Sequence, residues 1–263
     1  SAQDIDSYNN WESQLIKMLY DPRVYLHNMS DFFEFTIELL KNNTLYKSGS
    51  VTWVATETGF NFEYTDFLKI VIDNTDLRCY FSSDSTGIRN TSGYLLPDSN
   101  LWIGNKGKIT WHRSGIHEDS VFVELKDYQL ELTSSEYKID SVFFTSNKFS
   151  DEPILGSVED KVVVNPDTNS VRYPKFESYD KEIVIKDFVK DIDYKGGYSM
   201  QGRFFIGSGT EKNKAMLTIH KGDSLLMTAR SINFGIRNNQ IIAYNTEIVI
   251  PIEQDSLYHK NLL

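Results

Sequence analysis

The pattern of hydrophobic and polar positions predicts two helices at the start of the chain. The first carries an apolar face made of Trp11, Leu15, Met18 and Leu19, and it ends before Pro22 because the residue preceding a proline leaves the helical region. The second begins near Ser30, with Phe33, Ile37 and Leu40 on one stripe and Phe32, Phe35 and Leu39 beside it. The short connection predicts an antiparallel hairpin that buries Trp11, Leu15, Phe33 and Ile37 and covers one end or edge of the region behind it.

From about Ser48 onward the hydrophobic period falls to two, which is typical of strands. Turn-forming residues recur at short intervals with no helical segment between them. The expected strands cover residues 67–73, 77–81, 108–112, 121–132, 141–145, 161–164, 182–186, 199–206, 216–220, 225–234 and 240–250. Residues 221–223 and 237–239 join the last three strands and have the composition of hairpin turns.

Local features predict corners within this β region. The alternation changes parity at Lys126-Asp127, which requires a bulge or corner because a one-residue slip moves every side chain to the other face. The glycine-rich segments 194–202 and 207–209 are flanked by Tyr, Phe and Ile in strand rhythm, so we interpret them as corners or bulges too. A faint repeat, GSVTW at 49–53 and GKITW at 107–111, suggests a duplicated β layer or two solenoid coils.

These patterns predict a mainly β fold of layered antiparallel sheets, either a sandwich or β-solenoid-like, with an N-terminal α-helical hairpin. We expect the hairpin over residues 1–45, a first β region over 46–165 and a second over 166–263. Alternatively, residues 46–263 form one continuous β domain. No apolar run approaches the length of a spanning helix, so we do not expect this segment to cross a membrane as a helix.

Composition and charge exclude several classes of function. Of the 263 residues, 40% are hydrophobic and 13% are aromatic, which is typical of a folded protein with a large core. The formal net charge of −10 has the wrong sign for holding a phosphate backbone, so no nucleic-acid partner is expected. A single cysteine rules out an internal disulfide framework and a cysteine-based zinc site. We interpret Cys79 as a buried structural thiol.

Few residues are spaced for catalysis or metal binding. His112 and His117 lie near the acidic residues 118–119, but they match no zinc-protease motif, and we interpret the segment as a polar loop. The acidic segments 73–76 and 82–85 are interpreted as turns between strands, because neither supplies the donor set of a calcium loop. The glycine-rich segments lack the following helix that a phosphate loop needs. We therefore assign no catalytic residue, no metal site and no cofactor.

Three tryptophans, Trp53, Trp102 and Trp111, are candidates for a ligand-facing aromatic surface on which sugars stack. Packing in the core is the alternative interpretation, because each lies in a strand pattern. Acid–base catalysis by a pair of carboxylates is a further alternative that the sequence does not decide. Glycosidase carboxylates lie far apart in sequence, and the chain has 37 acidic residues.

Both ends of the chain suggest a piece of a longer, exported protein. The start, residues 1–4, looks like the region after a signal-peptide cleavage site, although an arbitrary boundary would look similar. The strand at 240–250 is followed by Leu257, Leu262 and Leu263 and by no polar cap. We therefore expect further β structure to follow, and we expect the last strand to be an exposed edge through which the chain associates with itself.

Three segments together carry a resemblance to a known family. Residues 104–115, 173–181 and 193–202 resemble the N-terminal part of a family of very large, exported, uncharacterised β-rich envelope proteins of Bacteroidetes-type bacteria. The resemblance implies a mostly β architecture and an extracytoplasmic location, in the periplasm, at the outer membrane surface or secreted, and it supplies no catalytic residues. Residues 137–144 and 229–234 are more distantly similar to strands of the lipopolysaccharide-transport β-jellyroll family, which has an apolar groove between two sheets.

These observations favour a binding module over an enzyme. We expect a non-enzymatic β-rich module of a larger secreted or cell-envelope protein, which binds or scaffolds a polysaccharide or an envelope protein. One alternative is a carbohydrate-active enzyme with an acidic residue pair. Another is a lipid-transport β-groove, which would show a continuous apolar channel.

Overall fold

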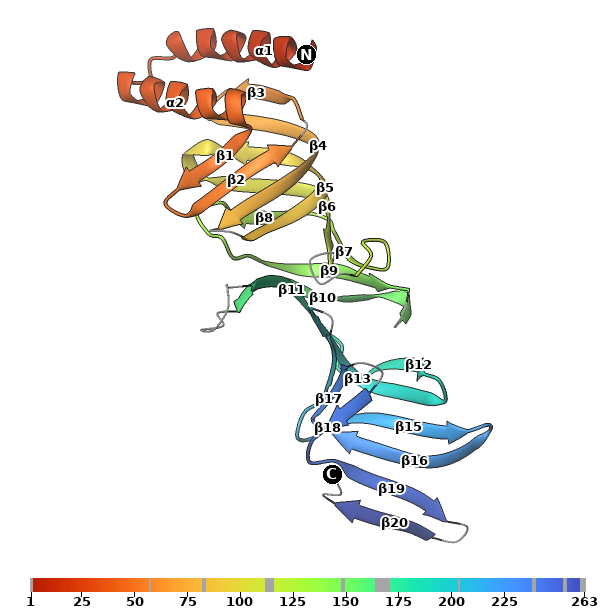
Figure 1. Cartoon of the computed structure of the whole chain (residues 1–263). Helices are drawn as coiled ribbons and strands as arrows, with labels where there is room; N and C mark the ends of the chain where they lie inside the picture. The colour runs from red at the N-terminus through yellow and green to blue at the C-terminus, as the bar shows by residue number, and fades with distance from the viewer. Residues whose placement is uncertain are drawn as a thin grey trace. The chain divides into compact units, whose positions relative to one another are not determined.

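A computed structural model describes residues 2–56, 58–81, 84–111, 116–147, 150–163, 171–202, 204–237, 240–252 and 255–260. Two helices, α1 (Ala2–Leu19) and α2 (Leu26–Asn42), precede the strands, and a short 3-10 helix, η1 (Pro97–Ser99), lies between β5 (Asp84–Leu96) and β6 (Leu101–Thr110). Every strand register determined is antiparallel. The mainly β, layered fold with an N-terminal helical hairpin is therefore confirmed (Figure 1).

The first ten strands are β1 (Thr44–Ser48), β2 (Val51–Thr56), β3 (Phe60–Tyr64), β4 (Leu68–Phe81), β5 (Asp84–Leu96), β6 (Leu101–Thr110), β7 (Val121–Leu125), β8 (Tyr128–Glu131), β9 (Lys138–Ser146) and β10 (Ser150–Val163). The remaining strands are β11 (Val171–Ser178), β12 (Ile183–Val189), β13 (Ile192–Gln201), β14 (Phe204–Ser208), β15 (Ala215–Lys221), β16 (Ser224–Ser231), β17 (Asn233–Arg237), β18 (Gln240–Ala243), β19 (Glu247–Ile252) and β20 (Asp255–Lys260).

The chain divides into two compact units that do not follow the expected division at residue 165. Unit 1 comprises residues 1–109, 124–139 and 160–172, and unit 2 comprises residues 110–123, 140–159 and 173–263. The observed units differ from the expected β regions because each unit contains three separate segments of the chain. A single boundary in the sequence does not describe such units.

Unit 1 is organised around the long strand β4. Its first half, residues 68–72, pairs with β3, and its second half, residues 76–81, pairs with β2. On its other side β4 pairs with β5, and the sheet continues through β6 to β8. Strand β1 pairs with β2. One strand thus joins two neighbours that lie end to end.

Strands β4 and β5 both bend at an asparagine. Asn74 (φ 52°) and Asn90 (φ 49°) adopt the left-handed conformation, which asparagine tolerates better than most residues, and the pairing registers shift beside them. The N–H of Asn74 donates to Ser92 Oγ (2.9 Å), and the N–H of Asn90 donates to Asp76 Oδ1 (3.0 Å). Residues 73–76 are therefore an internal corner of one strand, so the expectation of a turn between two strands is wrong. The second acidic turn falls partly on residues 82–83, outside the described residues.

In unit 2, strand β13 belongs to two sheets. Its first half, residues 192–195, pairs with β15 and with β12, whereas residues 197–201 pair with β14 and, over residues 199–201, with β11. Between the halves lies Gly196, where a side chain would collide with the Tyr194 hydroxyl and with Ala215. The corner predicted from the glycine-rich segment is confirmed.

The C-terminal strands of unit 2 change sheet in the same way. Strands β16 and β19 pair with each other beside β15, while β17 and β18 pair with each other beside β14. Each of the two expected long strands, residues 225–234 and 240–250, is therefore two strands with a corner between them. At one corner Ser231 Oγ donates to the carbonyl of Tyr244, at 2.9 Å. Strand β19 lies between β16 and β20, so it is not the terminal edge that the sequence suggested.

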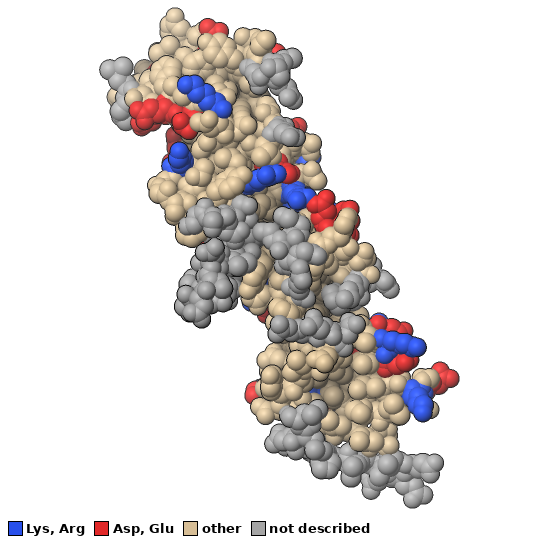
Figure 2. Space-filling model, in the orientation of Figure 1, with Lys and Arg blue, Asp and Glu red and all other residues tan. Residues whose placement is uncertain are grey.

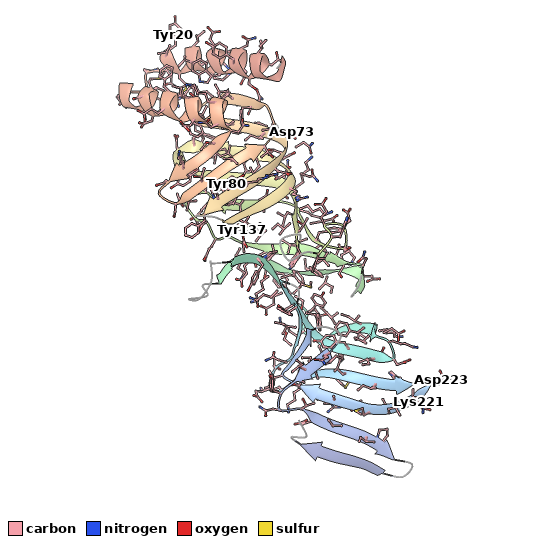
Figure 3. The ribbon with its side chains drawn as sticks, viewed as in Figure 1. Tyr20, Asp73, Tyr80, Tyr137, Lys221 and Asp223 are labelled. Carbon is pink, nitrogen blue, oxygen red and sulfur yellow. The ribbon has the colours of Figure 1, made fainter. Side chains whose placement is uncertain are left out.

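Other boundaries follow the sequence more closely. The hairpin turn around Gly222 joins β15 and β16, and Lys221 and Asp223 mark its tip in Figure 3. The parity change at Lys126-Asp127 is the break between β7 and β8. The expected strand at 199–206 is wrong, because β13 and β14 form a hairpin there.

Helix α1 covers the edge of β3 with polar side chains. Ser7 Oγ, Asn10 Oδ1 and Gln14 Oε1 accept hydrogen bonds from the backbone N–H groups of Phe60 (3.0 Å), Phe62 and Tyr64 (3.2 Å). The three acceptors lie on one helix face and the three donors alternate along the strand. The predicted covering of a sheet edge by the hairpin is therefore confirmed, and the two helices lie next to β3 and β1 in Figure 1.

The buried faces of the helices differ from the predicted stripes. Helix α2 buries Met29, Phe32, Thr36 and Leu39. Phe33 and Ile37 are exposed, and Trp11 and Leu15 are only partly buried, so the expected burial of these four is wrong. The reason in α1 is that it faces a row of N–H groups, and such a row needs hydrogen-bond acceptors in contact with it. Within the described residues, neither helix is long and apolar enough to cross a membrane.

The core of unit 1 contains a buried hydrogen-bond chain around Tyr128. Trp102 Nε1 donates to the Tyr128 hydroxyl (3.1 Å), which lies 2.6 Å from Thr91 Oγ1. Thr91 Oγ1 in turn donates to the carbonyl of Lys106, at 2.7 Å. Burial raises the pKa of Tyr128 to about 12. The unfolded tyrosine titrates near ~10, so the stabilisation that Tyr128 provides is complete below pH ~10 and is lost as the pH rises toward ~12.

We expect Tyr128→Phe to lower the free energy of unfolding by about 1–3 kcal/mol at neutral pH, because Trp102 Nε1 loses its acceptor in a buried site. The variant should also lose less stability than the wild type between pH 9 and pH 11. Urea unfolding at both pH values, followed by tryptophan fluorescence, measures both effects. Tyr80→Phe is the control, since Tyr80 is exposed on β4 (Figure 3). An equal loss of unfolding free energy in Tyr128→Phe and Tyr80→Phe would contradict the stabilising role of the Tyr128 hydroxyl.

Candidate functional site: a groove between β10 and β12

The three candidate tryptophans are core residues. Trp53, Trp102 and Trp111 are all fully buried. Trp53 donates through Nε1 to the carbonyl of Ser134 (3.1 Å), and Trp111 packs edge-on against Phe144 with ring centroids 5.5 Å apart. The ligand-facing hypothesis is therefore corrected in favour of core packing.

The other candidates from the sequence do not form a site. Cys79 is buried in β4, as predicted for a structural thiol. His117 is exposed, and its Nδ1 lies 3.8 Å from a carboxylate oxygen of Asp119, while His112 falls outside the described residues. Within the part of the chain that the structure describes, no group of three or more His, Cys, Asp or Glu side chains is placed to hold a metal ion.

One candidate site is a groove in unit 2, here called the β10–β12 groove. Its volume is about 930 Å³. One wall is residues 152–155 of β10, the other is residues 182–188, which include most of β12, and Asn147, Tyr179 and Asp180 complete the lining. The volume lies in the range of ordinary ligand sites.

The groove runs along strand edges. Successive side chains of a strand point to opposite faces of its sheet, so a cavity over one face touches every second residue. This groove instead touches seven consecutive residues, 182–188, and four consecutive residues, 152–155. It therefore lies beside both strands, in the plane where another strand would lie.

The turn between β11 and β12 opens the groove by carrying the chain away from β10. The N–H of Tyr179 still donates to the carbonyl of Leu155 (3.1 Å), but the pairing ends there. Ser178 Oγ donates to the carbonyl of Asp180 (2.6 Å), and Asp180 Oδ1 accepts the N–H of Glu182 (2.7 Å). These short-range bonds stabilise a turn where the strand would otherwise continue.

Three large apolar side chains of the groove are exposed. Leu155, Tyr179 and Val184 are 44%, 46% and 59% exposed. Tyr179 is held in place, because its hydroxyl donates to Asp140 Oδ1 (3.0 Å) and accepts the N–H of Ser141 (2.8 Å). An exposed apolar cluster with an anchored ring is typical of an interaction surface.

The inner side of the groove is part of the core of unit 2. Ile154, Ile185 and Phe188 line the groove and are buried. The Phe188 ring lies 4.5 Å from that of Phe205 and 5.5 Å from that of Tyr194, measured between centroids. Phe205 belongs to the sheet of β13 and β14, so rings from both sheets of the unit support the groove.

The charge around the groove is mainly acidic. Its lining holds four carboxylates and one ammonium group, on Glu152, Asp180, Glu182, Asp187 and Lys186. Glu182 is 3.6 Å from the ammonium group of Lys195, and both side chains are exposed, so this ion pair adds little stability. On the face shown in Figure 2, the basic residues of the described chain form small separate clusters. The lining therefore favours a cationic ligand.

The groove residues were not identified in the sequence, although a weak signal exists. Residues 183–185 are three consecutive apolar residues at the start of β12. Such a run is typical of a strand with two covered faces, yet Val184 is exposed. Comparison with known protein families, with curated proteins and with solved structures finds no match to this chain.

Proposed function

We propose that this chain is a non-enzymatic binding module of a larger extracytoplasmic protein and that it holds a partner protein in the β10–β12 groove. The observation that carries the proposal is a groove between two strand edges with Leu155, Tyr179 and Val184 exposed in it. Exposed apolar clusters of this kind mark sites that another surface covers. The extracytoplasmic part of the proposal rests on the resemblance of residues 104–115, 173–181 and 193–202.

A protein partner fits the lining better than a polysaccharide does. Sugar sites use flat aromatic rings, but Trp53, Trp102 and Trp111 are buried. The exposed groove side chains are mainly aliphatic, and they lie beside backbone edges, which bind peptide rather than carbohydrate.

The two alternative functions have less support. The pKa of Asp21 and of Glu177 is lowered, in each case mainly by a hydrogen bond from a basic side chain, whereas a glycosidase general acid needs a raised pKa. In unit 2, the aromatic rings of both sheets pack together at Phe205, where a lipid-transport groove would need open space.

The test is a selection of displayed random peptides against the intact chain. We expect enriched peptides to bind the wild type and to lose at least about tenfold in affinity, or ~1.4 kcal/mol, in the variant Leu155→Glu/Val184→Glu. Leu226→Glu is the control, because Leu226 is exposed on β16 outside the groove. Thermal unfolding of both variants establishes that they fold.

Two results would overturn the proposal. One is a set of enriched peptides that bind the groove variant as well as the wild type. The other is release of reducing sugar from a polysaccharide panel that is abolished by Asp180→Asn or Glu182→Gln, which would identify an enzyme.

A further inference from the structure

We propose that the β10–β12 groove takes its partner as an added strand, in which a short, basic, extended segment of the partner pairs with the outer edge of β12. This inference rests on the proposed function and specifies the chemistry of the ligand. Addition of a strand to a sheet edge is a recurring way to bind peptides, because main-chain hydrogen bonds supply affinity and side-chain pockets supply specificity.

The receiving edge is that of β12. The strand pairs with β13 on one side, with Ile183 opposite Gly196, Val184 opposite Lys195 and Ile185 opposite Tyr194. In an antiparallel strand, alternate residues direct their N–H and C=O groups to opposite edges. The groove touches every residue from 182 to 188, so the backbone groups of the second edge of β12 face into it.

The opposite wall is a poorer template. Pro153 of β10 has no N–H to donate, and proline is one of the residues that protect strand edges from pairing. The carbonyl of Leu155 already accepts the N–H of Tyr179. Strand β10 therefore supplies the side wall of the groove, and β12 supplies the hydrogen bonds.

A bulge limits the length of the added strand. Asp187 has a φ of 47°, and the pairing of β12 with β13 shifts between Ile185 and Val189. The N–H of Asp187 donates to Asp193 Oδ1 (3.0 Å), so it is not available to a ligand. The regular part of the edge is residues 183–185, which accommodates a core of about three paired residues.

The side chains of β12 and of the groove predict a ligand in which apolar and basic residues alternate. Ile183 and Ile185 share one face of β12, and Ile185 is buried, so partner side chains next to them on that face should be apolar, as cross-strand pairs require. Glu182 and Val184 share the opposite, exposed face. The groove lining holds four carboxylates against the ammonium groups of Lys186 and of the nearby Lys195, so positive charge is favoured in ligand side chains on that face. A second copy of this chain is a poor occupant, because its own β12 would bring the same acidic lining against this one.

The probe is a capped eight-residue peptide of alternating lysine and valine, with alternating glutamate and valine as its charge-reversed partner. We expect the lysine peptide to bind at least about tenfold more tightly than the glutamate peptide at low salt, with the difference shrinking as salt screens it. Isothermal titration calorimetry with the intact chain measures both. The double variant Glu152→Gln/Glu182→Gln should reduce the difference in affinity between the lysine and glutamate peptides. The control Glu131→Gln, which lies outside the groove, should leave that difference unchanged.

Backbone methylation distinguishes strand addition from other modes of binding. Methyl groups on alternate amide nitrogens block one edge of an extended peptide and leave the other edge intact. We expect methylation in one frame to weaken binding at least about tenfold, or ~1.4 kcal/mol, and methylation in the other frame to change it less than about threefold. If both frames bind alike while Leu155→Glu/Val184→Glu still abolishes binding, strand addition is overturned and the groove remains the binding site. If neither the lysine peptide nor any displayed peptide depends on the groove, both proposals are overturned.

Discussion

Replacing Phe205 by alanine is expected to remove about 3–5 kcal/mol from the free energy of unfolding, which is the usual cost of truncating a fully buried phenylalanine. Phe205 is 1% exposed. Its ring centroid lies 4.5, 4.7 and 5.3 Å from those of Phe188, Tyr198 and Tyr194. One substitution therefore removes packing from three aromatic neighbours and leaves a cavity where the two sheets of unit 2 meet.

The neighbouring residue provides a matched control. Phe204 lies on the same strand, β14, but its side chain points to the other face and is 42% exposed. Phe204→Ala should change stability by about 1 kcal/mol or less. Chemical denaturation of both variants tests the comparison. Because Phe188 is also a lining residue, Phe205→Ala should weaken peptide binding in the groove as well. Similar stability losses at the two positions would show that the rings do not form the core described here.

The periodicity of the sequence predicts the fold class because it reflects which face of each element is covered. The change from helical to strand spacing near Ser48, the parity change at Lys126-Asp127 and the corner at Gly196 are local, and each is found in the structure. Strand β5 was missed because its sequence is rich in Ser, Thr and Gly, which is typical of a loop. Its buried polar residue Thr91 is satisfied by Lys106 and Tyr128, which are distant in the sequence.

The helix faces show a second limit of local patterns. Hydrophobic spacing assumes that a helix packs on an apolar surface. Helix α1 instead packs on a row of N–H groups, so its contact face carries Ser7, Asn10 and Gln14 and most of its larger apolar side chains lie elsewhere. The nature of the partner surface decides the face, and that surface comes from residues 60–64, far along the chain.

The groove was not predictable for a related reason. Leu155, Tyr179 and Val184 are ordinary strand residues in the sequence, and their exposure follows from the turn at 178–182, which separates two strands that would otherwise be adjacent. The tryptophans show the opposite case. Trp53, Trp102 and Trp111 have side chains suited to binding sugars, but the sheets bury them. Exposure is decided by tertiary structure, so the residue types alone indicate neither the groove nor its ligand.

The triple variant Ser7→Ala/Asn10→Ala/Gln14→Ala is expected to release helix α1 from β3. Each substitution leaves a backbone N–H of β3 without its acceptor, and a buried unsatisfied donor costs about 1–3 kcal/mol. The N–H of Phe60 and its acceptor Ser7 are buried, so the largest single contribution is expected there. Amide hydrogen exchange should become faster at Phe60, Phe62 and Tyr64, and it should change little in the second half of β4.

Release of α1 should also change the association state of the chain. The edge of β3 would then present a row of N–H groups to another molecule, and such an edge is a template for pairing between chains. We expect the triple variant to form dimers or larger species in sedimentation velocity experiments. The double variant Asn9→Ala/Ser13→Ala is the control, because it alters two exposed positions of the same helix and keeps all three acceptors. A triple variant that stays monomeric, with the wild-type exchange rates at the three amides, would show that apolar contacts of α2 hold the hairpin on the sheet without the polar face of α1.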